Sequence, residues 1–373
     1  MKRPALDPPP SRVLLTRLSA IGDCLLTIPL AVRIKQLWPN CHLTWVVDCA
    51  AAELLEAHPA VDQVLRIDKR WLAHPSRWGT LRDELRGRSF DVAFDPQGLS
   101  KSSLLGVLSG AKLRVGYDYS QGREIAPLLA NCRLGRTARH MVDTYLELLG
   151  PWCETPRGTG RFDMPIYVAA AARVEQLLSG LGWRSSTTPS GGGRQHDTSG
   201  TPWVALNVGA GWPSKRWPPE RFGRIASDIF QRSGERSLVL WAGENEQALA
   251  EQVVDHSRGA AELAPATSLC ELLELIRRAS LLVSSDTAAL QMASAVGTTC
   301  VGLFGPTWAD EVGPYGNRHV AIQSTVLPDH KRGMRRSSSA SMTAIEISEV
   351  LHACSKLLTS AQQAPALKIC RAA

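Results

Sequence analysis

The stretch "RLSAIGDCLLTIP", residues 17–29, places an aspartate directly after a glycine, where a short apolar run gives way to a helical pattern. The run before it, "RVLLT" at 12–16, is typical of a buried strand, and residues 23–37 repeat leucine and isoleucine at helical spacing. A carboxylate at such a strand-to-helix turn repels phosphate. Asp23 is therefore a poor part of a phosphate cradle and a natural candidate for a base that accepts a proton.

Short apolar runs and helix-patterned segments continue to alternate along the chain. Further strands are expected at 42–48, 61–68 and 91–95, and later within "PWVALNVGAG", "RSLVLWAGENE", "ASLLVSSDTAAL" and "TTCVGLFGPT". Alternation of this kind predicts an α/β fold with a parallel, doubly wound sheet. The 373 residues are too many for one comfortable core, so we expect two such domains.

Two stretches interrupt the alternation. Residues 184–201, "RSSTTPSGGGRQHDTSGT", have no apolar content and three consecutive glycines, so we expect a flexible, exposed loop. Residues 330–342 are basic and rich in serine; we expect a solvated loop, with contact to anionic lipid as the alternative. We place the first domain at 1–165 and the second at 166–342.

The composition narrows the class of protein without deciding it. A net charge of +7 suits an anionic substrate, an anionic membrane surface or nucleic acid. No apolar run reaches the roughly 18–20 residues of a membrane span, and the N-terminus lacks the apolar core of a signal peptide, so we expect a cytoplasmic location. The nine cysteines are scattered without metal-ligand spacing, so we expect neither disulfides nor a metal site.

Polar side chains follow the strands of the second half, where open α/β sheets bind ligands. Gly209, in "NVGAG", would let a ligand approach the backbone closely. Lys215 can neutralise a diphosphate, and Glu244 can accept hydrogen bonds from ribose hydroxyls. Asp286 and Thr287 stand at the start of a helix, where free backbone N–H groups bind phosphate; a simple helix cap is the alternative for Asp286.

The usual nucleotide and hydrolase signatures are absent from the sequence. No GxGxxG follows the first strand, and neither a Walker A motif nor a G-x-S-x-G elbow stands out. Dehydrogenase, P-loop and serine-hydrolase interpretations therefore lose their usual support.

An ordered series of stretches resembles glycosyltransferase family 9, the ADP-heptose:lipopolysaccharide heptosyltransferases. The series consists of residues 17–48, "FDVAFDPQGLSKSS", "GAGWPSKRWPPERF", "LWAGENE" and "SSDTAALQMASAVGTTCVGLFGPTWADEVGPYG". The resemblance implies a GT-B fold, in which two Rossmann-like domains face across a cleft and the last helix, 343–361, packs back on the first domain. It also implies inverting, metal-independent transfer, without a cofactor, from ADP-heptose or a related nucleotide-sugar to a lipopolysaccharide-core or similar glycolipid acceptor.

The resemblance further implies roles for single residues. Asp23 would be the general base that takes the proton of the acceptor hydroxyl as it attacks the anomeric carbon. Donor binding would use Gly209, Lys215, Glu244, Asp286, Thr287, Ala288 and Gln291. The acceptor would meet Gln97, Lys101, Arg123 and His140.

The phosphate turn departs from the family's D-T-G-x-x-H pattern. Ala288 stands in place of the glycine and Gln291 in place of the histidine, which restricts the backbone and removes a possible charge. Two alternatives therefore stay open: a nucleotide-sugar-binding protein without turnover, and a nucleotide-sugar epimerase on a similar scaffold. As partners we expect a nucleotide-sugar donor, a lipid-linked acceptor and peripheral contact with the inner face of the cytoplasmic membrane, but no nucleic acid.

Overall fold

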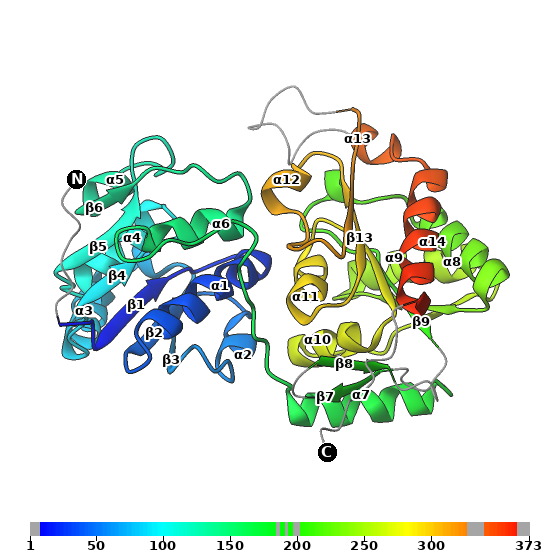
Figure 1. The fold of residues 1–373 in the computed structure, drawn as a ribbon, viewed down its shortest axis with the longest axis horizontal. Helices are drawn as coiled ribbons and strands as arrows, with labels where there is room; N and C mark the ends of the chain where they lie inside the picture. The colour runs from blue at the N-terminus through cyan, green and yellow to red at the C-terminus, as the bar shows by residue number, and fades with distance from the viewer. Residues whose placement is uncertain (1–7, 184–186, 191–192, 197–201, 327–338, 364–373) are drawn as a thin grey trace, which may run out of the picture. The chain divides into compact units, whose positions relative to one another are not determined.

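The computed structural model describes residues 8–183, 187–190, 193–196, 202–326 and 339–363. It divides into two compact units. The first comprises Met1–Ala170, Ser268–Leu273 and Asp310–Tyr315, and the second comprises Ala171–Thr267, Glu274–Ala309 and Gly316–Ala373. Each unit is built around its own six-stranded parallel sheet (Figure 1), as the sequence predicted.

The first unit has the strand order β3-β2-β1-β4-β5-β6. Its strands are β1 (Arg12–Thr16), β2 (His42–Val47), β3 (Gln63–Arg66), β4 (Val92–Phe94), β5 (Leu113–Tyr117) and β6 (Cys132–Leu134). Its helices are α1 (Ile21–Leu37), α2 (Ala52–Leu55), α3 (Trp78–Gly87), α4 (Ser100–Leu108), α5 (Ala126–Leu129) and α6 (Met141–Leu146), with short 3-10 turns at Trp71–Ala73, Pro75–Arg77 and Glu147–Leu149.

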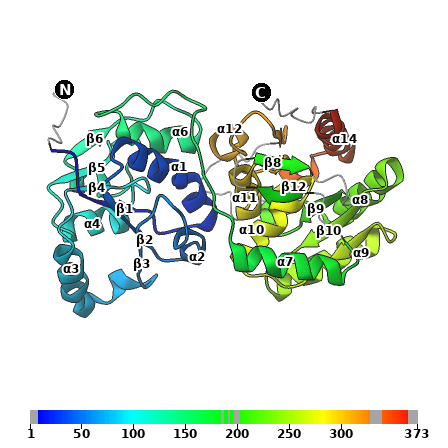
Figure 2. The ribbon, with the colours of Figure 1, turned by 60° about the horizontal axis from the view of Figure 1, so that its bottom comes forward.

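Strand β1 lies in the interior of this sheet, and its side chains are buried on both faces. Val13, Leu14 and Leu15 have no exposed surface, and the register pairs Val13 with Leu43 of β2 and Val92 of β4. A strand covered by helices on both faces needs a continuous apolar run, which "VLL" supplies. Helices α1 and α6 pack together on one face, and α3 and α4 pack together on the other (Figure 2).

The second unit has the strand order β11-β10-β9-β12-β13-β14. Its strands are β9 (Trp203–Asn207), β10 (Arg236–Leu240), β11 (Ala261–Leu263), β12 (Leu281–Ser285), β13 (Cys300–Phe304) and β14 (Val320–Gln323). Its larger helices are α8 (Pro219–Ser233), α9 (Glu244–His256), α10 (Leu269–Arg278), α11 (Ala288–Val296) and α14 (Ile347–Gln363). Shorter elements are the 3-10 turn Pro213–Lys215, α12 (Ala309–Val312) and α13 (Ala340–Thr343), and α7 (Val168–Gly180) leads into the unit.

The stretch 184–201 is not a plain loop throughout. Within it β7 (Thr187–Ser190) and β8 (Gly193–His196) pair antiparallel, and the rest of the stretch lies outside the described residues. The prediction is wrong for these two segments because strand pairing satisfies backbone hydrogen bonds without requiring apolar side chains. Most of the basic stretch 330–342 also lies outside the described residues, apart from its last residues, which enter α13.

The predicted packing of the last helix on the first domain is wrong. The buried residues of α14, among them Val350, Cys354 and Leu358, belong to the core of the second unit. There α14 packs against α8 and the strands β12, β13 and β14. Its apolar stripe completes a layer with the amphipathic α8, whose Phe222 and Ile225 are fully buried.

Two short segments of the predicted second domain group with the first unit instead. Cys270, near the start of α10, donates its backbone N–H to Glu53 Oε1 at 3.1 Å. Tyr315, after α12, donates its hydroxyl to Asp143 Oδ1 at 2.6 Å. Such contacts join residues far apart in the sequence, and a domain boundary inferred from local sequence patterns cannot predict them. Among the described residues, no helix is both long and apolar enough to span a membrane.

Candidate active site

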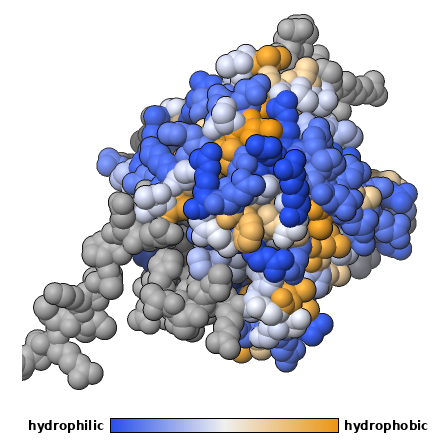
Figure 3. Space-filling view, turned by 90° about the vertical axis from the view of Figure 1, so that its right-hand side faces the viewer, coloured by the Kyte–Doolittle hydropathy of each residue, from blue (hydrophilic) through white to orange (hydrophobic). Residues whose placement is uncertain are grey.

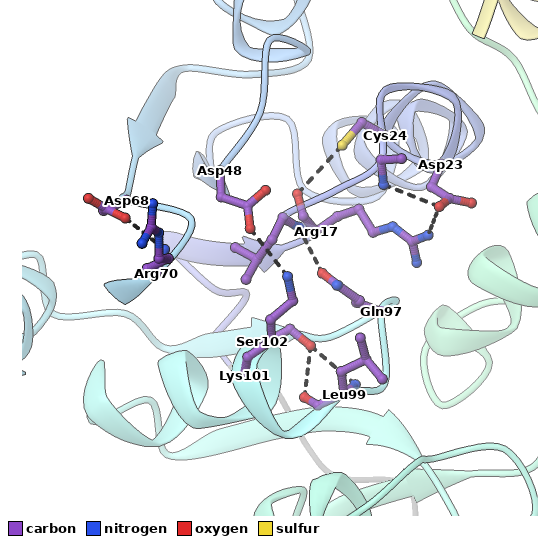
Figure 4. Close-up of polar contacts among 12 residues, drawn as sticks. Arg17, Asp23, Cys24, Asp48, Asp68, Arg70, Gln97, Leu99, Lys101 and Ser102 are labelled. Carbon is purple, nitrogen blue, oxygen red and sulfur yellow. Dashed lines mark hydrogen bonds and ion pairs between the residues drawn. The ribbon is translucent and has the colours of Figure 1, made fainter. Parts of the chain in front are cut away.

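Asp23 lies in the first turn of α1, beyond the carboxyl end of β1 (Figure 4). Its Oδ2 accepts a hydrogen bond from the Ala20 N–H at 3.2 Å and pairs with Arg17 Nη2 at 2.9 Å. The positive end of α1 further stabilises the carboxylate. The side chain is 38% exposed, and no described residue donates a hydrogen bond to Oδ1. Asp23 therefore does cap the helix, yet it keeps one carboxylate oxygen available.

Arg17 is a site residue that the sequence analysis missed. It is 6% exposed, its Nη1 donates to the Pro96 carbonyl at 3.2 Å, and its guanidinium lies 5.3 Å from the centre of the Tyr145 ring. Burial by itself lowers the pKa of Arg17, but the neighbouring Tyr145, Asp23 and Cys24 outweigh it, and the net pKa is raised. Arg17 is thus a fixed, buried cation that orients Asp23.

Lys101, predicted to meet the acceptor, is paired with a buried carboxylate. Its Nζ lies 3.2 Å from Asp48 Oδ2, and the Asp48 side chain is 1% exposed while that of Lys101 is 27% exposed. The second oxygen, Asp48 Oδ1, is buried and has no hydrogen-bond partner among the described residues. Asp48 directly follows β2, so its place after a strand was the signal that could have identified it.

Gln97 lies in the loop after β4, and its side chain reaches the loop after β1. Its Oε1 accepts the Leu18 N–H at 2.8 Å (Figure 4). The loop is shaped by Asp95, whose Oδ1 accepts the Gln97 and Gly98 N–H groups, each at 3.1 Å. Burial raises the pKa of Asp95, although its hydrogen bonds, including one from Ser103, work against this rise. Asp95 therefore positions Gln97 and does not face solvent itself.

The two other predicted acceptor residues differ from each other. Arg123 is exposed, and within the described chain no ion pair engages its side chain. His140 is the N-cap of α6: its Nδ1 accepts the Val142 N–H at 3.2 Å, and its Nε2–H donates to the Gly313 carbonyl at 3.0 Å. Both nitrogens of His140 are thus used inside the protein, so the geometry does not support its predicted acceptor contact.

Lys215 and Asp286 form a largely buried ion pair in the second unit. Lys215 ends the 3-10 turn after β9, and its Nζ lies 2.5 Å from Asp286 Oδ2 and 3.9 Å from the centre of the Trp212 ring. The two charged side chains are 9% and 13% exposed. The structure therefore brings these two predicted donor residues together, and a bound diphosphate would have to share Lys215 with a carboxylate.

Thr287 is the N-cap of α11, but its hydroxyl faces the sheet. Its Oγ1 lies 3.2 Å from Asn207 Nδ2 and 3.0 Å from Ser284 Oγ. Asn207 Nδ2 also donates to Ser284 Oγ at 3.0 Å, so the three side chains tie the end of β9 to the end of β12. No side-chain cap covers the first turn of α11, which leaves an N-terminus suited to an anion. Asn207 and Ser284 were missed, although both lie at the ends of strands.

The substituted residues of the phosphate turn occupy different environments. Ala288 is the first residue of α11, where it follows Thr287. Gln291, one turn later, is only 2% exposed. The Gln291 side chain is therefore part of the packed interior, and its predicted contact with the donor has no exposed amide to make it.

The carboxylate nearest to Gly209 belongs to Glu246, not to the predicted Glu244. Glu244 begins α9 and is exposed, whereas Glu246 accepts the Ala242 N–H at 2.9 Å. A Cβ added at Gly209 would lie 2.3 Å from Glu246 Oε2. Burial raises the pKa of Glu246, partly offset by the hydrogen bond from Ala242. Gly209 thus makes room for Glu246.

The two units define the class of protein. Two Rossmann-like doubly wound units, one with an aspartate after its first strand and the other with a lysine beside an uncapped helix start, define the GT-B fold class. The chain belongs to glycosyltransferase family 9 (heptosyltransferase), whose family model matches residues 78–340.

Individual relatives agree with this assignment. The chain is 27% identical over 328 residues to "Lipopolysaccharide heptosyltransferase 1" of Pseudomonas aeruginosa, covering 84% of each chain. A solved family 9 glycosyltransferase from Veillonella parvula matches 94% of this chain and 97% of its own with a TM-score of 0.74 and 20% identity. The E. coli heptosyltransferase WaaC with ADP matches 93% and 99% with a TM-score of 0.70 and 20% identity. The two structural likenesses show the shared fold.

Proposed function

We propose that this glycosyltransferase moves a heptose from ADP-heptose to a lipopolysaccharide-core acceptor with inversion at the anomeric carbon. The name of the P. aeruginosa relative and the ADP in the E. coli structure support the sugar, the acceptor class and the nucleotide. The observation that carries the proposal is Asp23, a half-exposed carboxylate held by Arg17 with Oδ1 available. The family assignment gives no support to the epimerase or to a binder without turnover.

On the acceptor side, we assign the proton transfer to Asp23. Inversion requires a base to take the proton of the acceptor hydroxyl while that oxygen attacks the anomeric carbon from the face opposite the leaving group. Arg17 pairs with the carboxylate through Nη2 and directs it. Gln97, Lys101 and Arg123 supply polar and cationic contacts for an acidic acceptor, and His140 is left out of this set.

On the donor side, we assign the diphosphate to Lys215 and the start of α11. The developing negative charge on the leaving ADP requires a nearby cation and N–H donors. Lys215 supplies the cation, and the uncapped first turn of α11 supplies the N–H groups. Glu246, behind Gly209, replaces Glu244 as the carboxylate best placed near this loop. Because these groups meet the charge, we expect transfer to need neither metal ion nor cofactor, and dialysis against EDTA to leave the rate unchanged.

The test is a transfer assay with synthetic ADP-heptose and a deacylated lipopolysaccharide-core acceptor, combined with a melting panel of ADP, UDP, GDP and CDP. ADP at about 100 times its Kd should add about 2.7 kcal/mol of stability, and the other nucleotides should add less. Asp23→Asn should lower kcat by about 10²–10⁴-fold and keep the ADP-induced shift. Asp68→Asn is the matched control, because the one hydrogen bond of the Asp68 carboxylate to a described residue is from the Arg70 N–H at 2.7 Å.

Two results would contradict the proposal. Full activity of Asp23→Asn would remove the base assignment. A melting rise with another nucleotide but not with ADP would replace the donor. We further propose a cytoplasmic location with peripheral contact to the membrane, because the proposed acceptor is a glycolipid.

A further inference from the structure

Exposed apolar side chains gather in one place on the first unit. Among the described residues, the large hydrophobic side chains that remain exposed are Leu72, Tyr119, Ile125, Leu128, Val168, Phe230 and Val326. Three of these seven lie within ten residues, at Tyr119, Ile125 and Leu128, with exposed fractions of 64%, 53% and 62%. The coloured part of the side shown in Figure 3 is mostly hydrophilic, with hydrophobic residues interspersed.

The segment 118–133 holds these side chains in a defined geometry. Ile125 is the N-cap of α5, and Leu128 lies one turn later, with its N–H bonded to the Ile125 carbonyl at 3.0 Å. Residues three apart lie on the same face of a helix, so the two apolar side chains project together. The Tyr119 ring lies under the Arg133 guanidinium, 5.5 Å from its centre.

The charge around the segment is mainly positive. Residues 112–139 contain six lysines and arginines against two acidic residues. Arg123 and Arg133 are exposed, and no described carboxylate pairs with either of them. The two acidic residues are engaged locally but not buried: Asp118 Oδ1 accepts the Ser120 N–H at 2.9 Å, and the exposed Glu124 accepts the Ser100 N–H through Oε2 at 3.1 Å. Arg139 pairs with Asp310, so Arg123 and Arg133 are the exposed cations that remain to meet an anionic surface beside these apolar side chains.

The same segment is bonded to the loop that carries Gln97. The Arg123 N–H donates to the Gly98 carbonyl at 2.9 Å, and the Ile125 N–H donates to Ser100 Oγ at 3.2 Å. A surface that binds Ile125 and Leu128 would therefore lie beside the proposed acceptor residues.

We propose that the segment 118–133 docks on an anionic lipid surface, with Ile125, Leu128 and Tyr119 entering the headgroup region and Arg133 contacting lipid phosphates. Exposed apolar side chains next to exposed arginines are a combination that binds such an interface. This inference rests on the proposed function, since a glycolipid acceptor must be reached at the membrane. Docking here brings the acceptor's sugar end to the loop of Gln97.

The test is co-sedimentation of the full chain with vesicles of phosphatidylcholine containing phosphatidylglycerol. Ile125→Ser/Leu128→Ser should weaken binding at least tenfold, since two large apolar side chains leave the interface. Arg133→Gln should weaken it about fivefold at low salt and less at high salt. Phe230→Ser, which removes an exposed apolar side chain of α8, is the matched control and should bind like wild type.

Activity separates this inference from the proposed function. The double serine variant should transfer to a deacylated, soluble acceptor at the wild-type rate and lose transfer to an acceptor embedded in vesicles. Wild-type binding by the double variant, or no vesicle binding by the wild type, would overturn the docking surface. A dimer in sedimentation velocity that the double variant abolishes would also overturn it and assign the surface to a second copy. Vesicle binding without transfer to either acceptor would refute the proposed function alone.

Discussion

Arg17 Nη2 lies 2.9 Å from Asp23 Oδ2, and this ion pair joins a buried cation to the half-exposed carboxylate at the start of α1. Asp23→Asn leaves the buried guanidinium without its counter-charge, so we expect a loss of about 1–2 kcal/mol, less than for a fully buried pair because Asp23 is 38% exposed. Arg17→Met/Asp23→Asn should be less destabilised than the sum of the single variants, as measured by urea unfolding. Additivity within about 0.5 kcal/mol would mean that the pair is not coupled.

Substitutions of Lys215 and of Asp286 should change the binding of ADP in opposite directions. Lys215→Met removes the cation proposed to meet the diphosphate, so we expect the Kd for ADP to rise about tenfold or more. Asp286→Asn leaves a buried ammonium unpaired and should lower Tm. Because ADP would then supply the missing counter-charge, the ADP-induced rise in Tm should be larger in Asp286→Asn than in wild type. A smaller rise would argue that Asp286 itself holds the nucleotide-sugar.

Gly209→Ala should act through Glu246. The new Cβ would meet the Glu246 carboxylate at 2.3 Å, and the flexible side chain would move away and lose its hydrogen bond from Ala242. We expect a cost of about 1 kcal/mol in the free energy of unfolding. In the background Glu246→Ala the same glycine change should cost little. An equal cost in both backgrounds would show that the backbone, not Glu246, requires a glycine.

Cys49 should be the most reactive of the partly exposed thiols. A hydrogen bond from the Cys24 thiol lowers the pKa of Cys49 to about 7, although burial works against this. Carboxymethylation followed by mass spectrometry should give a pH midpoint near this value, and Cys24→Ala should move it upward. Cys132, whose pKa burial raises, is an internal reference. Equal midpoints for Cys49 and Cys132 would contradict the contact.

His140 should make the fold sensitive to acid. Burial lowers the pKa of His140 below the usual 6.5, so the unfolded chain binds a proton more readily than the folded chain. Stability is therefore present above about pH 6.5 and declines as the pH falls below it. His140→Asn keeps a capping acceptor but does not titrate, so the difference in unfolding free energy between pH 7 and pH 5 should shrink. An equal difference in the wild type and in His140→Asn would contradict this role of His140.

Much of the fold could be predicted because strands and helices leave a local signature. The run at Val13–Leu15 predicted a buried strand, which the structure confirms, and the sequence placed Asp23, Lys215 and Asp286 after strands, where the structure has them. The choice between Glu244 and Glu246 could not be made in this way. Gly243 is the N-cap of α9 with a φ of 73°, and that turn decides which carboxylate reaches Gly209.

The sequence by itself determined the two α/β units, the family and the positions of the charged residues at strand ends, because each follows from periodicity or motif within a short window. Only the tertiary structure decided which of those residues stay available. Arg17 is held against Asp23 by its contacts with residues 96 and 145. His140 is hydrogen-bonded to the Gly313 carbonyl, and the apolar stripe of α14 completes the core of the second unit. Each of these features depends on contacts between segments that are distant in the sequence, because those contacts determine which side chains are buried and which are hydrogen-bonded.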